Sequence, residues 1–325
     1  MTESVGRSAW HGIEVRHLAA LQALAEEASF HGAARRLGYS QPAVSQQLAA
    51  LERIVGVQLV NRPRVSQPLT LTEAGKRLLI HARAVQSSLA TAEAEVCTGK
   101  ARLRIGTYQT VSSLLLPHVI RELERREPQV DIVLDDRPVD GILVKALERN
   151  EIDACFVDLP LRFEGHLQTR PLAFDDYVLV LPRNGQRGIG TSVHPIELRG
   201  LNLIGFKSSG STQRVIDHLR ADGIEPHFVV RADDNNVVQG FVTAGFGAAL
   251  IPRLTAELMS GSFDVRAFEP ALPPRVIALA WKDDLTVAEP VRAFVDATTR
   301  VVRQIWRERA IETLHEVPPV ASAHL

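Results

Sequence analysis

Three uncharged polar side chains near the start of the chain could read the edges of DNA bases. Gln41 and Ser45 are four residues apart and Gln46 is adjacent, so one face of a helix would present all three. Pro42 suits the first turn of such a helix. Amides and hydroxyls hydrogen bond to bases in the major groove, and glutamine pairs best with adenine. These residue types predict a recognition helix for double-stranded DNA; the alternative is a helix whose polar face is only solvated.

Arginines around this helix are suited to the phosphate backbone. Residues 16–64 hold six arginines, three glutamates and no lysine, whereas the whole chain is balanced at 37 basic and 38 acidic residues. Arginine binds phosphate well, so a small basic module joined to a larger acidic body is the simplest interpretation. We expect DNA contacts from Arg53, Arg62 and Arg64. His31 is a further candidate, with an ordinary surface histidine as the alternative.

Two hydroxyl-rich runs, at residues 107–113 and 207–212, are candidates for binding a small molecule. Each opens a helical pattern, and ligands of open α/β sheets bind where strands end and helix N-termini present free amides. The positive ends of these helices, together with Lys207, predict a small organic anion as the effector. The alternative is that the hydroxyls only cap helices. The candidate effector-binding residues are Thr107, Thr110, Ser112, Lys207, Ser208, Ser209, Ser211, Thr212, Asp234 and Asn235.

Patterns typical of catalysis and metal binding are missing from the sequence. There is no GxSxG elbow, no Walker loop and no HExxH among the eleven histidines. Cys97 and Cys155 are the only cysteines and form no CxxC, which excludes a disulfide scaffold and a thiolate zinc site. We therefore expect no enzymatic activity, no cofactor and no metal.

The DNA-binding residues require a compact helical module, which we place at residues 14–72. Apolar residues at 33, 34 and 37, and then at 44, 48 and 51, have helical spacing. Gly38 between the two groups suits a helix end and Ser40 suits a helix cap. A preceding helix over about residues 16–28 completes a three-helix core. The arginine-bearing loop near residues 61–68 is typical of a wing, with a solvated surface loop as the alternative.

A long helix follows at residues 73–100, and its apolar residues repeat at intervals of four and three. This spacing is typical of a helix that pairs with another helix. We expect a dimerisation helix; the alternative is a core helix of a larger domain. The predicted seam consists of Leu78, Ala82, Val85, Leu89, Ala92 and Val96.

The remainder, residues 101–310, alternates short apolar strands with amphipathic helices. This alternation predicts an α/β domain with parallel strands, and its length suits two lobes. We expect the chain to cross between lobes near residues 182 and 265, and residues 317–325 to be disordered. No run reaches 18 apolar residues and no signal peptide is evident, so we expect a cytoplasmic protein.

Together these residues resemble the LysR-type transcriptional regulators. The resemblance rests on the pattern from Ser29 to Glu52, on Gly56-Val57-x-Leu59 with a following arginine, and on LTEAG at residues 71–75. It implies a winged helix-turn-helix followed by a periplasmic-binding-protein-like pair of lobes with a ligand between them. The sequence departs from the family in having Val60 where phenylalanine is usual and in a wing about two residues longer.

The resemblance also implies partners. They are double-stranded DNA, a small-molecule effector and further copies of the chain in a dimer or tetramer, with RNA polymerase as another candidate and no membrane. Two other functions stay open from the sequence. One is a small-molecule binding protein or enzyme with an accessory helix-turn-helix, and the other is a redox sensor that uses Cys97 and Cys155.

Overall fold

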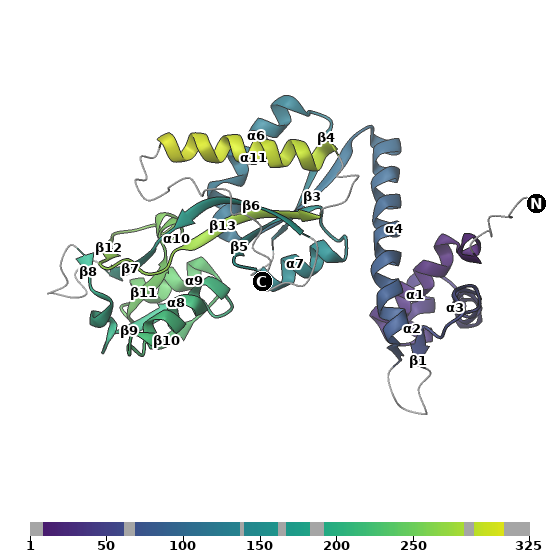
Figure 1. Ribbon diagram of the computed structural model, residues 1–325, viewed down its shortest axis with the longest axis horizontal. Helices are drawn as coiled ribbons and strands as arrows, with labels where there is room; N and C mark the ends of the chain where they lie inside the picture. The colour runs from purple at the N-terminus through teal and green to yellow at the C-terminus, as the bar shows by residue number, and fades with distance from the viewer. Residues whose placement is uncertain are drawn as a thin grey trace, which may run out of the picture. The chain divides into compact units, whose positions relative to one another are not determined.

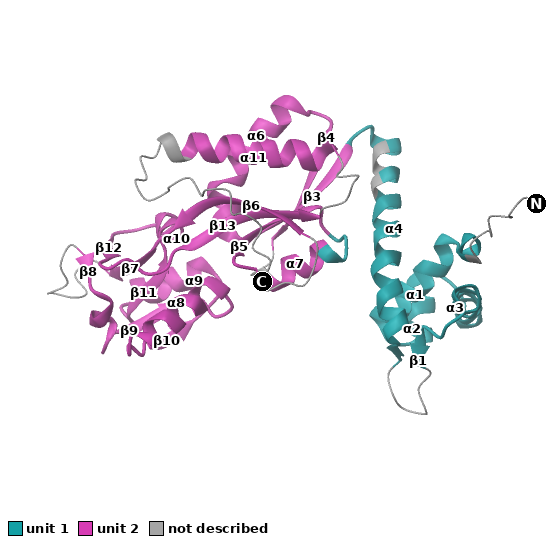
Figure 2. Ribbon diagram, in the orientation of Figure 1, with its two compact units in different colours: residues 1–100, 148–151 teal, residues 101–147, 152–325 magenta. Residues whose placement is uncertain are grey.

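The computed structural model describes residues 9–61, 69–136, 140–161, 167–182, 192–282 and 289–308. Figure 1 shows their helices and strands. The chain divides into two compact units, which Figure 2 colours separately. Unit 1 comprises residues 1–100 with 148–151, and unit 2 comprises residues 101–147 with 152–325. In the part of the chain that is described, none of the helices combines the length and apolarity needed to cross a membrane.

Unit 1 begins with helices, and Gly38 and Ser40 end and cap them where the sequence predicts. The Ser29 hydroxyl caps the second helix by accepting from the Gly32 amide at 3.0 Å, and Ser40 caps the third in the same way. Gly38 and Gly56 end these two helices with φ of 69° and 80°, in the left-handed region that favours glycine. The elements are a 3-10 helix Ala9–Gly12, α1 Val15–Glu27, α2 Phe30–Leu37 and α3 Gln41–Val55.

A short β-ribbon and a long helix complete unit 1. Strand β1 (Val60–Asn61) pairs antiparallel with β2 (Thr70–Leu71), and α4 (Glu73–Thr98) follows. The predicted wing residues Arg62 and Arg64 come between these strands in the sequence and lie outside the described residues. Residues 317–325, expected to be disordered, also lie outside them. The core of unit 1 joins α1, α2, α3 and the start of α4.

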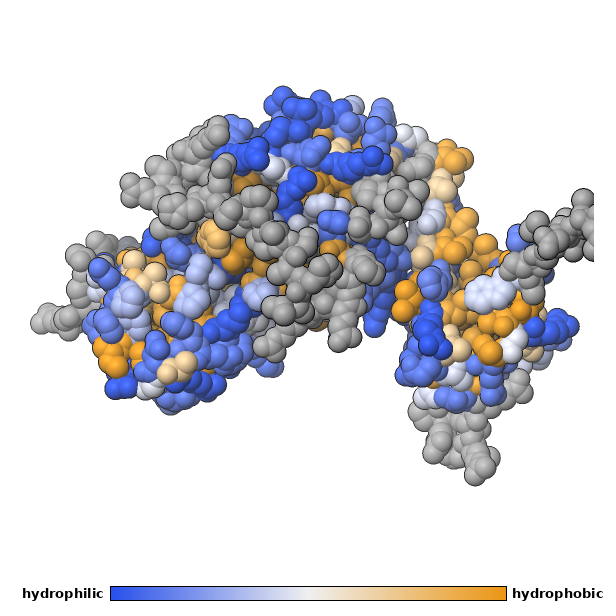
Figure 3. All heavy atoms as spheres, in the orientation of Figure 1, coloured by the Kyte–Doolittle hydropathy of each residue, from blue (hydrophilic) through white to orange (hydrophobic). Residues whose placement is uncertain are grey.

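The expected dimer seam on α4 is only partly available to another helix. Leu78 and Ala82 are 7% and 0% exposed and pack into the core of their own unit. They are therefore wrong as dimer contacts, because the first turns of α4 are needed to close the three-helix core. Val85, Leu89 and Val96 are 41%, 46% and 85% exposed. The apolar side of α4 that faces solvent begins at Val85, and Figure 3 shows apolar residues along it.

The first lobe of unit 2 is built on a sheet of five described strands in the order β4-β3-β5-β13-β6. Strands β4, β3 and β5 run parallel, and β13 is antiparallel to both of its neighbours. Helices α5, α6 and α11 cover one face and α7 covers the other, so the inner strands β5 and β13 are largely buried on both sides (Figure 1). The bounds are β3 Ala101–Thr107, α5 Gln109–Leu114, α6 Leu116–Arg126, β4 Val130–Asp136, α7 Asp140–Glu148, β5 Ala154–Leu159, β6 Leu167–Asp175, β13 Arg275–Lys282 and α11 Glu289–Glu308.

The second lobe holds a sheet of six described strands in the order β10-β9-β11-β7-β12-β8. Helix α8 packs on one face and α9 on the other. The bounds are β7 Tyr177–Pro182, β8 Ser192–Val193, a 3-10 helix Pro195–Leu198, β9 Asn202–Gly205, α8 Gly210–Ala221, β10 His227–Arg231, α9 Asn235–Thr243, β11 Ala248–Pro252, α10 Arg253–Glu257 and β12 Phe263–Phe268.

The crossovers between lobes lie at other positions than those expected near residues 182 and 265. The chain leaves the first sheet at Asp175 and enters the second at Tyr177, and it returns between Phe268 and Arg275. A single residue separates β6 from β7, so the sequence offers no loop that would mark the first crossover. Residue 265 lies inside β12. The first expected position differs because a change of sheet within an extended segment leaves no composition signal, whereas the second crossover is the proline-rich segment at residues 269–274.

Candidate nucleic-acid interface and effector site

The predicted base-reading residues share the exposed side of α3. Gln41, Pro42, Ser45, Gln46 and Arg53 are all exposed. The opposite side of the helix is buried, because its apolar residues form part of the unit 1 core. These residues are Val44, Leu48 and Leu51. The polar groups of α3 are therefore free to meet base edges in a major groove.

His31 lies on a different helix from the base-reading residues. It is exposed in the first turn of α2, beside the cap made by Ser29. Backbone amides at a helix start attract anions, so the place suits a phosphate contact. An ordinary surface histidine would have the same exposure.

Glu52 is a functional residue that the sequence analysis did not single out. It lies on α3, and its Oε1 accepts hydrogen bonds from the backbone amides of Leu59 at 2.8 Å and Val60 at 3.3 Å. The recognition helix is thereby tied to the first strand of the wing. Glu52 is the last residue of the Ser29-to-Glu52 pattern. Its place in that pattern was the signal that could have drawn attention to it.

The other side of Leu59 is held by the start of α4. The Leu59 carbonyl oxygen accepts from the Thr72 amide at 2.9 Å. The Thr72 hydroxyl donates to the Gln58 carbonyl at 2.8 Å. The same hydroxyl accepts from the Gly75 amide at 3.0 Å. A Cβ on Gly75 would lie 2.1 Å from the Leu59 oxygen, so only glycine permits this approach. We name these bonds, from Glu52 through Leu59 to Thr72, the Leu59 clasp.

In unit 2, predicted effector residues at the start of α8 meet the end of β5 from the other lobe. The Ser211 hydroxyl donates to Asp158 Oδ2 at 2.9 Å. The Tyr177 hydroxyl lies 3.1 Å from the hydroxyls of both Ser211 and Thr212. All four side chains are buried. Burial raises the pKa of Tyr177 above its ordinary value, so its phenol stays protonated.

A buried ion pair extends this network to both crossovers. Tyr108 donates to Asp158 Oδ1 at 3.1 Å, and the Arg275 guanidinium lies 5.4 Å from the centre of the Tyr108 ring. Arg275 pairs with Asp175, the residue at which the chain leaves the first sheet. Burial is the largest single effect on the pKa of Arg275 and lowers it, but Asp175, Tyr108, Asp158 and Tyr177 together raise it above its ordinary value, so the guanidinium stays charged. We name the meeting place of Tyr108, Asp158, Tyr177 and Ser211 the lobe junction.

The sequence analysis missed most of the lobe junction. Asp158, Tyr177 and Arg275 lie inside or at the ends of apolar strands and match no motif. They come together only through the two-lobed fold. The available signal was weak, because a lone carboxylate ending a strand is common.

The predicted residues of the first lobe are bonded within the protein. Thr107 is fully buried, and its hydroxyl accepts from Ser112 at 3.1 Å. The hydroxyls of Thr110 and Thr255 lie 3.1 Å apart and join α5 to α10. These contacts leave Thr107 and Ser112 with structural roles, while Thr110 links the two lobes.

Two of the predicted residues of the second lobe, Ser209 and Asp234, cap helices. Ser209 caps α8 by accepting from the Thr212 amide, and Asp234 caps α9. The backbone amides of Lys207 and Ser208 both donate to Asp233. These two backbone amides, which lie where an anion was expected, are thus already bonded to the Asp233 carboxylate.

Asn235 differs from its neighbours. Its backbone amide donates to Gln109 Oε1 of the first lobe at 3.0 Å. Its side chain is only 9% exposed, and the Nδ2 atom has no hydrogen-bond partner among the described residues. A buried donor without a partner costs free energy, and a ligand with an acceptor atom would remove that cost.

Metal and cysteine chemistry find no support in the described part of the chain. No group of three or more His, Cys, Asp and Glu side chains there could hold a metal ion. Cys97 is exposed at the end of α4 in unit 1, and Cys155 is fully buried in β5 of unit 2.

Comparisons with known proteins match both units. Residues 15–76 match the family model described as "Bacterial regulatory helix-turn-helix protein, lysR family", and residues 98–303 match that of the "LysR substrate binding domain". A Mycobacterium avium protein named "Probable hydrogen peroxide-inducible genes activator" is 31% identical over 274 residues, covering 82% of this chain and 86% of that relative. A Shigella flexneri protein named "Uncharacterized HTH-type transcriptional regulator YfeR" is 28% identical, covering 76% of this chain and 81% of that relative.

Solved structures share the fold. The LysR family regulator CbnR has a TM-score of 0.64 at 22% identity, covering 89% of this chain and 99% of its own. A full-length OxyR variant from Pseudomonas aeruginosa has a TM-score of 0.63 at 23% identity, covering 89% of this chain and 97% of its own. CbnR has also been solved in complex with its target DNA, with a TM-score of 0.62 to this chain.

Proposed function

The chain belongs to the family of LysR-type transcriptional regulators, and from this premise we propose that it binds DNA as a dimer through α3 and responds to an effector at the lobe junction. Its relatives are transcriptional regulators. The observation that carries the proposal is the division of α3 into a buried apolar side and an exposed side of amides and hydroxyls.

Selection of bound duplexes from a random library tests the DNA-binding role. The selected site should contain adenine where Gln41 or Gln46 meets the groove. Gln41→Ala should then lose affinity for the selected site and keep its affinity for random duplex. Gln213→Ala, an exposed glutamine on α8, is the matched control and should bind as the parent does. Failure to enrich any sequence would refute the assignment of α3 as a reading helix.

Dimerisation is proposed through the exposed part of the α4 seam, from Val85 to Val96. An apolar stripe of this spacing is stabilised when a second helix covers it. Edge strands of unit 2 offer a second contact for a tetramer, because Val133 and Leu134 on β4 and Val229 on β10 are exposed apolar residues at the ends of the sheets. Unpaired strand edges with apolar side chains favour pairing with another chain.

The effector is proposed to be a small organic molecule with an acceptor group, of which a carboxylate is the first candidate. The support is Asn235, whose buried side-chain donor lies where α9 meets Gln109 of the other lobe. Such a molecule contacts both lobes and can shift their equilibrium by its differential affinity.

A thermal-stabilisation screen of carboxylates, neutral carbonyl compounds and amines tests this proposal. Hits should carry an acceptor and should lose their effect in Asn235→Ala. Ser208→Ala, which removes an exposed hydroxyl bonded to Asp233, is the control and should respond as the parent does. Hits without an acceptor, or hits unaffected in both variants, would refute the role of Asn235.

Peroxide sensing is not included in the proposal, although the Mycobacterium avium relative is named for it. A thiol sensor requires an accessible thiolate. Cys155 is 0% exposed in the middle of the first sheet. Its burial favours a structural role for Cys155, and Cys97 is exposed but has no second accessible cysteine with which to form a disulfide in the same chain.

A further inference from the structure

A carboxylate of the first lobe lies where the sequence predicted that an external anion would bind the second lobe. Asp158 is near the end of β5, and its Oδ2 accepts from the Ser211 hydroxyl at 2.9 Å. Ser211 is in the first turn of α8. The two side chains are 6% and 2% exposed. A helix start favours negative charge, and here the chain itself supplies that charge from its other lobe.

The Asp158 carboxylate is also held from the first lobe. Its Oδ1 accepts from the Tyr108 hydroxyl at 3.1 Å, and Tyr108 packs against the core of that lobe. The two oxygens of Asp158 thus accept hydroxyl protons from different lobes. Hydrogen bonds to a charged group are stronger than those between neutral groups. The bond from Ser211 therefore favours the arrangement in which the lobes touch.

Two further hydrogen bonds join the lobes close to Asp158. The Arg214 guanidinium of α8 donates to the carbonyl of Leu159, the residue after Asp158, at 2.8 Å. The Asn235 amide of α9 donates to Gln109 Oε1 at 3.0 Å. An amide in the first turn of a helix has no carbonyl of its own helix to bond. Hydrogen exchange of the Asn235 amide therefore reports whether the lobes are in contact.

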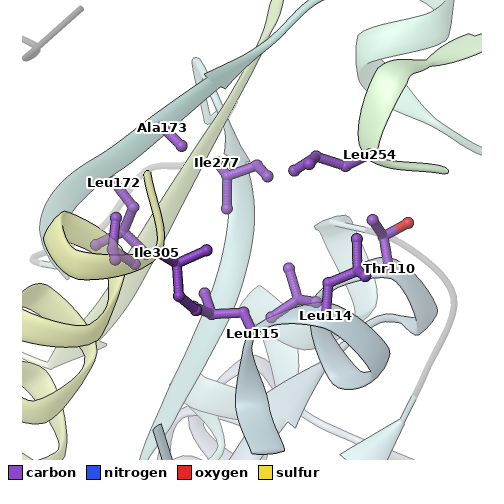
Figure 4. A pocket seen from close by; sticks show the side chains of 10 residues that line it. Thr110, Leu114, Leu115, Leu172, Ala173, Leu254, Ile277 and Ile305 are labelled. Atoms are coloured by element: carbon purple, nitrogen blue, oxygen red, sulfur yellow. The ribbon is translucent and has the colours of Figure 1, made fainter. Parts of the chain in front are cut away.

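The contact near the crossovers is of a different kind. Leu254 of α10 is buried in the hydrophobic core of the first lobe. Figure 4 shows its side chain beside Ile277 of β13, with Leu114 on the other side of an apolar pocket. Apolar packing is non-directional, whereas a hydrogen bond depends on its angle. The crossovers can thus act as a hinge while the polar contacts near Asp158 form or break.

We propose that Asp158 is an internal substitute for an anionic ligand: its carboxylate occupies the start of α8 and holds the two lobes together, so that no external anion is required there. We name the bond between Asp158 and Ser211 the Asp158 latch. An effector then acts on lobes that are already joined, and it changes their arrangement only by its differential affinity. This inference rests on the proposed effector response and concerns the regulation of the same junction.

Rescue by formate tests the Asp158 latch in the full-length protein. Asp158→Ala removes the carboxylate group, and formate is that group with one added hydrogen. In this variant the Asn235 amide should exchange about tenfold faster than in the parent, because the lobes lose a charge-assisted bond. Formate at ten times its Kd should slow this exchange by about tenfold. Amides of β11, in the core of the second lobe, are the internal reference.

Three solution controls identify what formate does. Formamide has nearly the same size and no charge, so it should not slow exchange in Asp158→Ala. Chloride at the same ionic strength should not do so either. The parent should respond to none of these compounds, because its own carboxylate already bonds to Ser211.

Two variants separate the contact between lobes from the contact within one lobe. Ser211→Ala removes the donor of the second lobe, so its Asn235 amide should also exchange about tenfold faster, without a response to formate. Tyr108→Phe removes the other bond of the same carboxylate, which lies within the first lobe, and should change this exchange by less than about threefold. These two variants carry the test where Asp158→Ala does not fold.

Three results would overturn the proposal. The first is unchanged exchange of the Asn235 amide in Asp158→Ala or in Ser211→Ala. The second is a formate effect that is absent from Asp158→Ala or equally large in the parent, since formate would then bind elsewhere. The third is a Tyr108→Phe variant that exchanges as fast as Ser211→Ala. Neither DNA nor an effector is present, so these outcomes are distinct from a failure of α3 or Asn235 in their proposed roles.

Discussion

Removing the Glu52 carboxylate should weaken the contact between the recognition helix and the wing. Glu52→Ala deletes the acceptor for two backbone amides, of Leu59 at 2.8 Å and Val60 at 3.3 Å. A hydrogen bond to a charged group contributes about 1.5–3 kcal/mol. The second bond is long and Glu52 is partly exposed, so water recovers part of the loss. We expect a local cost of about 2–3 kcal/mol.

Hydrogen exchange of the Leu59 and Val60 amides measures this cost directly. A loss of about 2–3 kcal/mol corresponds to exchange roughly 30 to 150 times faster when opening limits the rate. Glu52→Gln keeps a neutral acceptor and should lose only about 1 kcal/mol. Amides in the middle of α1 serve as the internal reference, since Glu52 makes no hydrogen bond to that helix within the described residues.

The result that refutes the reasoning is a change of less than threefold at Leu59 and Val60 in Glu52→Ala. Equally faster hydrogen exchange of the α1 amides would also contradict the reasoning, because Glu52 would then stabilise the whole unit rather than the Leu59 clasp. A Glu52→Gln variant as impaired as Glu52→Ala would show that charge, and not an acceptor, is what the two amides require.

Four further predictions follow from the other contacts. Gln41→Ala should cost about 1–3 kcal/mol at the selected DNA site and leave random duplex unaffected, as measured by fluorescence anisotropy. Leu89→Glu should convert the dimer to monomers in sedimentation, because a charge at this 46% exposed seam position would be buried by the partner helix. Gly75→Ala should lower the Tm and disrupt the start of α4, because its Cβ would lie 2.1 Å from a carbonyl oxygen. Arg275→Gln should destabilise unit 2 by about 3–5 kcal/mol in urea unfolding, since it leaves Asp175 buried without its charge partner, and adding Asp175→Asn should recover part of the loss.

The DNA-binding module could be predicted closely because its signals are local. Helix ends at Gly38 and Gly56 and the cap at Ser40 depend on residues within one turn of each other. The polar side of α3 follows from helical spacing alone. The bonds that hold Gln58, Leu59 and Val60 in the Leu59 clasp join residues seven to fourteen positions apart and have no periodicity, which is why Glu52 was not singled out.

The lobe junction could be predicted only in part, because it depends on the fold of a chain that crosses between two sheets. Ser211 and Thr212 were found from the run of hydroxyls at a helix start. Asp158 lies 50 residues from Tyr108 and 53 from Ser211, and no local pattern relates them. The α4 seam was predicted from spacing, and spacing does not say which turns of a helix face the core of their own unit, as those of Leu78 and Ala82 do.

The short exposed stripe on α4 has a geometrical consequence for a dimer. From Val85 to Val96 it spans about 17 Å at 1.5 Å per residue, while about 18 Å of the same helix extends from Val85 back to Glu73. The segment of α4 outside the contact is then about as long as the contact itself, and its far end moves when the angle between the paired helices changes. A change of 10° in the angle between two paired helices would move the Glu73 end by about 3 Å, close to the 3.4 Å rise of one base pair. In the proposed dimer, the clasp would carry that movement to α3, and we expect a small rotation between two chains to shift the spacing of the two α3 helices by about one base pair.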